Sequence, residues 1–125
     1  MVLIVAGVLM NRSLAKCPPA VETRIAAPDS SQEAVTFHFE CGFGRKGTTN
    51  VSIVPAGGAV AYPPNLFSAM DSSGVNLLLG REVRPAVDVA WEGPATVLIR
   101  YQAGARVVMR NAAARGVAAR YEERE

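Results

Sequence analysis

From about residue 20 onward, apolar and polar side chains alternate in short segments that Pro, Gly, Asn, Asp and Ser interrupt. The clearest segment places Val35, Phe37 and Phe39 in alternation with Thr36 and His38. Successive side chains of a strand point to opposite faces, so this alternation predicts a strand with one buried face and one exposed face. We expect the aromatic side chains in the core and His38 in solvent.

Similar segments recur along the chain. They are residues 21–25, 35–41, 50–54, 75–79, 87–91, 96–101, 105–110 and 117–121. Residues 92–94, Glu-Gly-Pro, predict a hairpin between their neighbours. Residues 56–73 read as a long loop with one turn at 66–70, and the alanine-rich residues 111–115 leave a helical turn open. The pattern predicts an all-β chain, a single small antiparallel β-sandwich or barrel-like domain of about seven strands.

The first ten residues carry no charge and resemble the apolar part of an export signal, which runs about 7–15 residues. They are too few to span a bilayer, which takes about 20. We therefore divide the chain into residues 1–16, a hydrophobic export signal or membrane-anchor remnant through which a membrane tether could form, and residues 17–125, the β domain. The alternative is that residues 2–9 form a buried first strand.

Cys17 and Cys41 are the only cysteines, and an even count in an exported chain favours one disulfide. Closing that loop would stabilise the fold by roughly 3–3.5 kcal/mol in the chain-entropy view. Two alternatives stay open: lipidation of Cys17, whose preceding Lys16 departs from a lipoprotein box, and two reduced thiols. The expected location is the cell envelope, whether periplasmic, secreted or membrane-tethered, with a cytoplasmic location as the alternative.

Charge and composition narrow the function classes. Half of the residues are hydrophobic and 19% are charged, which argues against disorder. Thirteen basic residues face 11 acidic ones, and a net charge of +2 creates no strong field for nucleic acid. We expect no nucleic-acid partner. A weak nucleic-acid-binding alternative depends on six arginines near Tyr101 and Tyr121. They are Arg100, Arg106, Arg110, Arg115, Arg120 and Arg124.

The sequence shows no motif for catalysis or metal binding. His38 is the only histidine, and no Cys/His spacing matches a zinc site. No serine lies in a Gly-x-Ser-x-Gly elbow. We predict no catalytic residue, no metal and no cofactor. The enzymatic alternative is a small hydrolase that uses carboxylate and imidazole chemistry from Glu40, His38 or Asp88.

Two loop segments are the predicted contact surfaces. Residues 42–47 form a basic, glycine-rich turn, and residues 56–73 form the long loop, and such loops often carry binding functions. We expect an interaction or accessory module whose partner is an unknown protein or envelope component. The candidate contact residues are Phe43, Arg45, Lys46, Tyr62, Asn65 and Phe67.

A series of short motifs adds a resemblance. In order, they are a cysteine after a hydrophobic N-terminus, Pro28-Asp29, Cys41-Gly42, Val51-Ser52-Ile53, a Val-x-Val-x-Trp segment ending at Trp91, Leu98-Ile99-Arg100-Tyr101 and Gly116-Val117 before Tyr121. Over residues 17–122 this order resembles a family of short uncharacterised bacterial envelope proteins. The resemblance implies a membrane-tethered or exported β domain of unknown function, with no catalytic residues to carry over.

Overall fold

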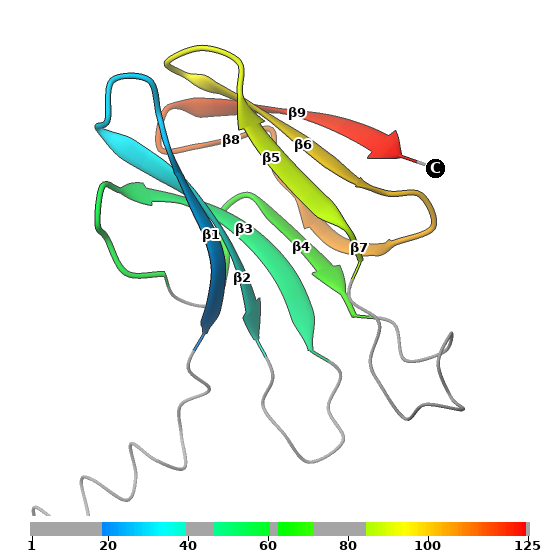
Figure 1. Ribbon diagram of the computed structural model, residues 1–125. Coiled ribbons are helices and arrows are strands. Elements are labelled where there is room, and N and C mark those ends of the chain that lie inside the picture. Colours follow the sequence, from blue (N-terminus) through cyan, green and yellow to red (C-terminus); the bar gives the residue numbers. More distant parts are fainter. Residues whose placement is uncertain (1–18, 40–46, 61–62, 72–84, 125) are drawn as a thin grey trace, which may run out of the picture.

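The computed structural model describes residues 19–39, 47–60, 63–71 and 85–124. These residues form nine strands and no helix, which confirms the all-β prediction (Figure 1). The strands are β1 (Ala20–Ala26), β2 (Gln32–Phe39), β3 (Thr48–Pro55), β4 (Phe67–Met70), β5 (Val87–Trp91), β6 (Thr96–Gln102), β7 (Arg106–Arg110), β8 (Ala113–Ala114) and β9 (Val117–Arg124).

The strands form two sheets that do not close into a barrel, so the sandwich is the correct one of the two predicted architectures. The first sheet has the order β1-β2-β3-β4-β7, and the second has the order β5-β6-β9-β8 (Figure 1). We call them sheet A and sheet C. All strand pairs are antiparallel except β6 and β9, which run parallel. The predicted hairpin is present as β5 and β6.

The main core lies between the two sheets. Its fully buried side chains come from both layers, so each sheet covers the apolar face of the other. They include Val51, Ile53 and Phe67 from sheet A and Val97, Ile99 and Val117 from sheet C. Alternate residues of β3 and β6 supply most of these groups, as the period of two requires.

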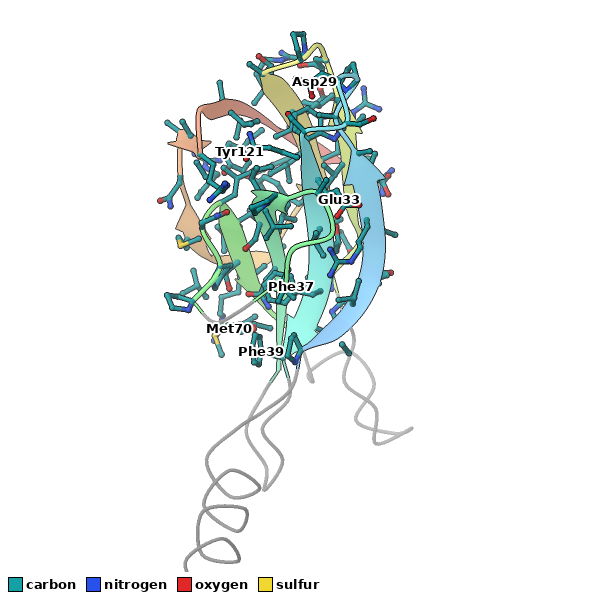
Figure 2. The ribbon with its side chains drawn as sticks, turned by 90° about the vertical axis from the view of Figure 1, so that its left-hand side faces the viewer. Asp29, Glu33, Phe37, Phe39, Met70 and Tyr121 are labelled. Atoms are coloured by element: carbon teal, nitrogen blue, oxygen red, sulfur yellow. The ribbon has the colours of Figure 1, made fainter. Side chains whose placement is uncertain are left out.

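Strand β2 is buried on both faces, which corrects our expectation of one exposed face. Ala34, Thr36 and His38 share the face of Val51 and Ile53 toward sheet C, and His38 is only 6% exposed. Val35 and Phe37 lie on the other face, where they form a second apolar cluster with Val54. Phe39 and Val60 pack against this cluster (Figure 2). The aromatic face is therefore turned away from sheet C, and His38 is turned into the interior.

The segment after β3 is fixed against the outer side of sheet A. Arg24 of β1 pairs with Glu33 of β2, at 3.1 Å, and donates to the carbonyl of Gly58, at 2.9 Å. Glu33 also accepts a hydrogen bond from the amide of Gly57, at 2.8 Å. These contacts hold the segment where Val60 covers the aromatic face of β2.

Two parts of the chain differ from the predicted elements. The predicted turn at residues 66–70 contains β4, a four-residue strand that pairs with β3 and β7 inside sheet A. The ambiguous residues 111–115 contain β8, a two-residue strand, rather than a helical turn. Both strands are too short to show a period of their own, and their conformation is set by their neighbours.

Several sequence predictions lie outside the described residues. These are the hydrophobic segment 1–16, the strand at 75–79, most of the turn at 42–47 and both cysteines, so the disulfide stays a prediction. Within the described parts of the chain, no helix has the length and apolar character needed to cross a membrane.

Candidate functional site

A row of four polar side chains lies at one end of the sandwich, where β2 ends and β3 begins. His38 and Thr49 are directly opposite each other in the β2–β3 ladder, so their side chains share the inner face. The Nδ1 atom of His38 lies 3.1 Å from Oγ1 of Thr49. The same face carries Val51 and Ile53 further along β3, so these polar groups continue the core toward the sandwich end.

Asp71 closes the inner end of this row. It follows β4 directly, and its amide donates to the carbonyl of Gly47 at 2.9 Å, which holds it beside the start of β3. Its Oδ1 atom accepts a hydrogen bond from the Thr49 hydroxyl at 2.7 Å. Thr49 and Asp71 are each 1% exposed, so this carboxyl is a buried one.

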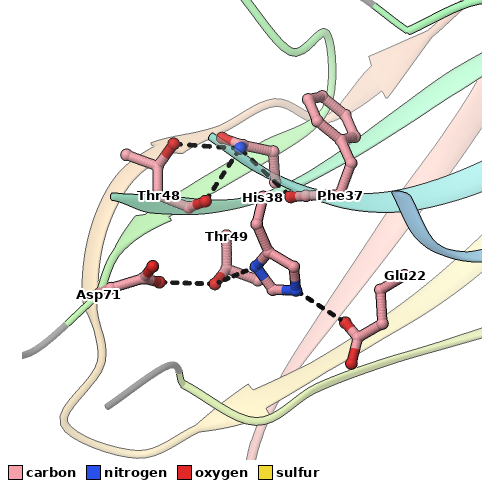
Figure 3. Close-up of polar contacts among 7 residues, drawn as sticks. Glu22, Phe37, His38, Thr48, Thr49 and Asp71 are labelled. Carbon is pink, nitrogen blue, oxygen red and sulfur yellow. Dashed lines mark hydrogen bonds and ion pairs between the residues drawn. The ribbon is translucent and has the colours of Figure 1, made fainter. Parts of the chain in front are cut away.

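Glu22 closes the outer end of the row through an irregularity in β1. Val21 pairs with Phe37 and Thr23 pairs with Thr36, so Glu22 is an extra residue in a β-bulge. Its Oε2 atom lies 3.1 Å from Nε2 of His38, although the carboxyl side chain is 54% exposed. Figure 3 shows the continuous row Glu22–His38–Thr49–Asp71, which we call the polar row.

The polar row contains the chemical parts of a hydrolytic triad, namely a hydroxyl, an imidazole and a carboxylate in hydrogen-bond order. Two features argue against such use. The Thr49 hydroxyl is only 1% exposed, and it lies 2.7 Å from the carboxylate of Asp71 as a donor. A nucleophile needs to reach a substrate carbonyl, and this oxygen is enclosed between sheets. The arrangement therefore fits a structural network.

A second polar cluster lies on the opposite face of sheet A. Asn50 is fully buried, and its amide nitrogen donates to the carbonyl of Phe37, at 3.3 Å, and to Thr48 Oγ1, at 3.0 Å (Figure 3). Its Oδ1 atom accepts from the hydroxyl of Ser68 at 2.7 Å. These bonds satisfy the amide within the sheet, as buried polar groups require.

The structure describes two of the six predicted contact residues, Asn65 and Phe67. Phe67 is fully buried in the core, with its ring centroid 5.4 Å from that of Tyr101, so it is not part of an accessible surface. Asn65 bonds to the backbone of Ile53 with both side-chain atoms. The other four lie outside the described residues. They are Phe43, Arg45, Lys46 and Tyr62.

The residues of the predicted hydrolase do not gather at His38. Asp88 of β5 pairs with Arg124 of β9, on the outer face of sheet C. Glu40 lies outside the described residues. Among the described residues, no group of three or more His, Cys, Asp or Glu side chains is arranged to hold a metal ion.

Several of the arginines that kept nucleic-acid binding open are paired with acids across sheet C. The pairs are Arg120 with Glu92, Arg100 with Glu122 and Arg124 with Asp88. Arg120 makes two bonds to Glu92, at 2.7 and 3.0 Å, and this hydrogen bonding lowers the pKa of the Glu92 carboxyl below its usual value. The acids offset the positive charge on this face. A phosphate backbone binds to uncompensated positive charge, so the pairing disfavours nucleic-acid binding here.

Sequence reasoning named His38 as a candidate but missed Glu22, Thr49 and Asp71. The alternation placed His38 on the wrong face, and Glu22 depends on a bulge that no turn residue marks. Asp71 follows a strand that was read as a loop. The one available signal was Thr48-Thr49-Asn50, a polar run at the start of an otherwise apolar strand.

Comparison of this chain with protein-family models, curated proteins and solved structures finds no match. The resemblance to bacterial envelope proteins is therefore a hypothesis that depends only on the motif order.

Proposed function

We propose that this chain is a non-catalytic interaction module of the bacterial cell envelope. The observation that carries the non-catalytic part is the burial of Thr49, whose hydroxyl donates to Asp71 inside the sandwich. The envelope location is supported by the uncharged first ten residues and by two cysteines that suit one disulfide. A sandwich with buried polar networks is a rigid scaffold on which loops can bind a partner.

The contact surface in this proposal is the end of the sandwich at which β2 ends and β3 begins. Residues 40–46 connect Phe39 to the start of β3, so the predicted contact residues Phe43, Arg45 and Lys46 belong to this connection. The loop after β3 starts from the opposite end of that strand, and it is pinned to sheet A through Arg24. We therefore favour the first segment over the second.

Site-specific photo-crosslinking in cells tests the contact surface. A photoreactive residue at Arg45 is expected to give a discrete adduct with one envelope component. The matched control is Ala90, which is exposed on β5 of the ion-paired face. Equal adducts from the two positions, or none from Arg45, would refute the proposed surface.

Cell fractionation with thiol counting tests the location. The full chain is expected in the envelope fraction with no free thiol before reduction and two after it. A protein in the cytosolic fraction with two free thiols would contradict both the envelope location and the disulfide.

The polar row supports hydrolysis as a second candidate function, because Thr49, His38 and Glu22 follow the order of a triad. Hydrolysis of p-nitrophenyl acetate by the wild type and by Thr49→Val decides between the two functions. We expect equal background rates. A loss of more than tenfold in Thr49→Val, with the fold retained, would favour the hydrolase.

A further inference from the structure

Strand β5 is an edge of sheet C (Figure 1), because β6 pairs with one of its sides and no strand of the described chain pairs with the other. The ladder to β6 is flanked by bonds to the Ala86 carbonyl, at 3.0 Å, and from the Glu92 amide, at 2.8 Å. Backbone groups of successive residues point to opposite sides of a strand, so those of Val87, Val89 and Trp91 face away from β6. Within the described residues, these amides and carbonyls have no hydrogen-bond partner.

The other edges of the two sheets have protection that β5 lacks. The registers of β1 and β7 are each interrupted by a shift, and β8 has only two residues. Strand β7 also carries Arg106 and Arg110 at its two ends. Bulges, short length and basic side chains are devices that prevent the pairing of edge strands. Strand β5 pairs with β6 in a regular register and contains no proline and no basic residue, so its edge is suited to accept another strand.

We propose that β5 pairs with β5 of a second copy of this chain. The two strands run antiparallel about Val89, so sheet C continues from one copy into the other. In this register Val89 lies opposite Val89 of the second copy, and Val87 lies opposite Trp91 of the second copy. The backbone groups that face away from β6 in each copy then bond to those of the other.

The inner face of β5 offers apolar side chains that the core covers only in part. Val87, Val89 and Trp91 pack against the main core, and each remains partly exposed. Pairs of β-branched and aromatic residues on opposite strands stabilise a sheet. The Trp91 indole is already fixed by its bond to the Ile25 carbonyl, at 2.8 Å, so it loses little freedom when the second copy binds.

The charges on the outer face of β5 select this register. Centred on Val89, the pairing places Asp88 opposite Ala90 of the second copy. Two neighbouring registers use the same hydrogen-bonding residues. One is centred on Asp88 and places this acid opposite itself, and the other is centred on Ala90 and places Asp88 opposite Glu92. Like charges directly opposite each other destabilise paired strands, so only the register about Val89 is free of this cost.

Sedimentation equilibrium of the full chain between about 10 and 500 μM tests the pairing, and the mean mass is expected to rise toward that of two chains. The apolar residues 1–10 could also cause association, so variants at Ala90 decide its origin. Ala90→Glu places a second acid opposite Asp88 and is expected to raise the Kd of the dimer about threefold or more. Ala90→Lys places a cation there and is expected to lower the Kd by a similar factor.

Ala118→Glu is the matched control, because Ala118 is an exposed alanine of β9 on the same outer face of sheet C. It is expected to keep the wild-type Kd, and circular dichroism checks that each variant keeps the fold. A wild type that stays monomeric over this range would overturn the proposal. So would a dimer that ignores both changes at Ala90, or one that responds equally to Ala118→Glu.

The β5 edge is separate from the contact surface proposed above, and crosslinking distinguishes the two. A photoreactive residue at Ala90 is expected to reach Asp88 of the second copy, so its adduct has twice the mass of the chain. The adduct from Arg45 contains a different envelope component. An Ala90 adduct with another protein would contradict the pairing of β5, whereas a missing Arg45 adduct would contradict only the proposed function.

Discussion

At the scale of single residues, Asn65 extends the ladder between β3 and β4 with its side chain. Strand pairing ends at Val51 and Phe67, and Ile53 lies beyond it. The Asn65 amide donates to the Ile53 carbonyl and accepts from the Ile53 amide, both at 2.8 Å. The side chain therefore replaces the missing peptide group of a partner strand. It prevents two backbone groups of a core strand from being left unpaired.

Asn65→Asp is expected to destabilise the protein by about 1–3 kcal/mol, because the carboxylate keeps the acceptor but loses the donor and faces the Ile53 carbonyl. Urea unfolding measures this loss. Asn111→Asp, which removes an exposed hydrogen bond of 2.9 Å to the Asn65 carbonyl, is the control and should cost less. Equal costs for the two variants would contradict the role of Asn65.

Arg115 is a second residue whose backbone conformation leads to a prediction. Its φ of 52° is followed by 77° at Gly116, the pattern of a two-residue hairpin turn between β8 and β9. Arg115 also exchanges two hydrogen bonds with Gln32, at 2.9 and 3.2 Å. In a Gln32→Ala background, Arg115→Asn is expected to stabilise by about 0.5–1 kcal/mol, since asparagine tolerates positive φ. Thermal unfolding measures the gain, and a lower Tm than the background would argue against it.

At the scale of the strands, β1 is an edge that the protein protects by two means. A bulge at Glu22 interrupts its regular hydrogen bonding, and the Trp91 indole of β5 occupies the Ile25 carbonyl. Both limit the addition of a foreign strand. The hydrogen bond from Trp91 to Ile25 also joins the two sheets along this side of the sandwich, opposite the side where β7 leads into β8.

Trp91→Phe is expected to cost about 1–2 kcal/mol, because it leaves the Ile25 carbonyl without its donor and removes packing at the β1–β5 side. Circular dichroism during chemical unfolding measures the cost, and sedimentation velocity detects self-association through the uncovered edge. If the variant is as stable as the wild type and associates no more, the hydrogen bond from Trp91 to Ile25 is dispensable.

The strands also show what the sequence could predict. Long alternating segments such as β5, β6 and β9 were identified correctly, because each pairs along most of its length and buries one face. Strand β2 was identified, but its two faces were assigned the wrong way round. Apolar side chains cover both faces, and alternation alone does not say which face packs against the other sheet. Asp71 and Glu22 reach His38 through a strand end and a bulge, and neither feature leaves a periodic signal.

At the scale of the whole molecule, the outer faces of the two sheets differ. Sheet C carries ion pairs, and the Glu92–Arg120 bridge joins the residue that follows β5 to β9. Leu98 of the intervening β6 lies between Ala90 and Arg120 on this face and is only 7% exposed. Sheet A instead carries the apolar cluster of β2 beneath Val60. Over β2, sheet A therefore lies between sheet C and the residues that follow β3, which include Val60.

Tyr121 of β9 connects the sheets at the side opposite β1. Its hydroxyl lies 2.9 Å from the Leu66 carbonyl and 2.6 Å from the Asn111 carbonyl, next to β4 and β7 of sheet A, and its single proton is shared between the two carbonyls. Its ring lies 6.1 Å from that of Phe67 and beneath the guanidinium of Arg110, 5.3 Å away. Burial raises the pKa of Tyr121 to about 12, against the opposing effect of the Arg110 charge. The neutral phenol is the form that fits between the sheets.

The raised pKa predicts how stability depends on pH in the alkaline range. An unfolded tyrosine ionises near 10, so the stabilisation due to the neutral Tyr121 is complete below pH 10 and is lost as pH rises through about 12. Wild-type stability, measured by urea unfolding, should therefore fall more steeply between pH 10 and 12 than that of Tyr121→Phe. The phenylalanine variant should also cost about 1–2 kcal/mol at pH 7, through the lost hydrogen bonds. The difference in absorbance at 295 nm between the wild type and Tyr121→Phe follows the ionisation of this phenol, and titration near 10 would show that burial does not keep it neutral.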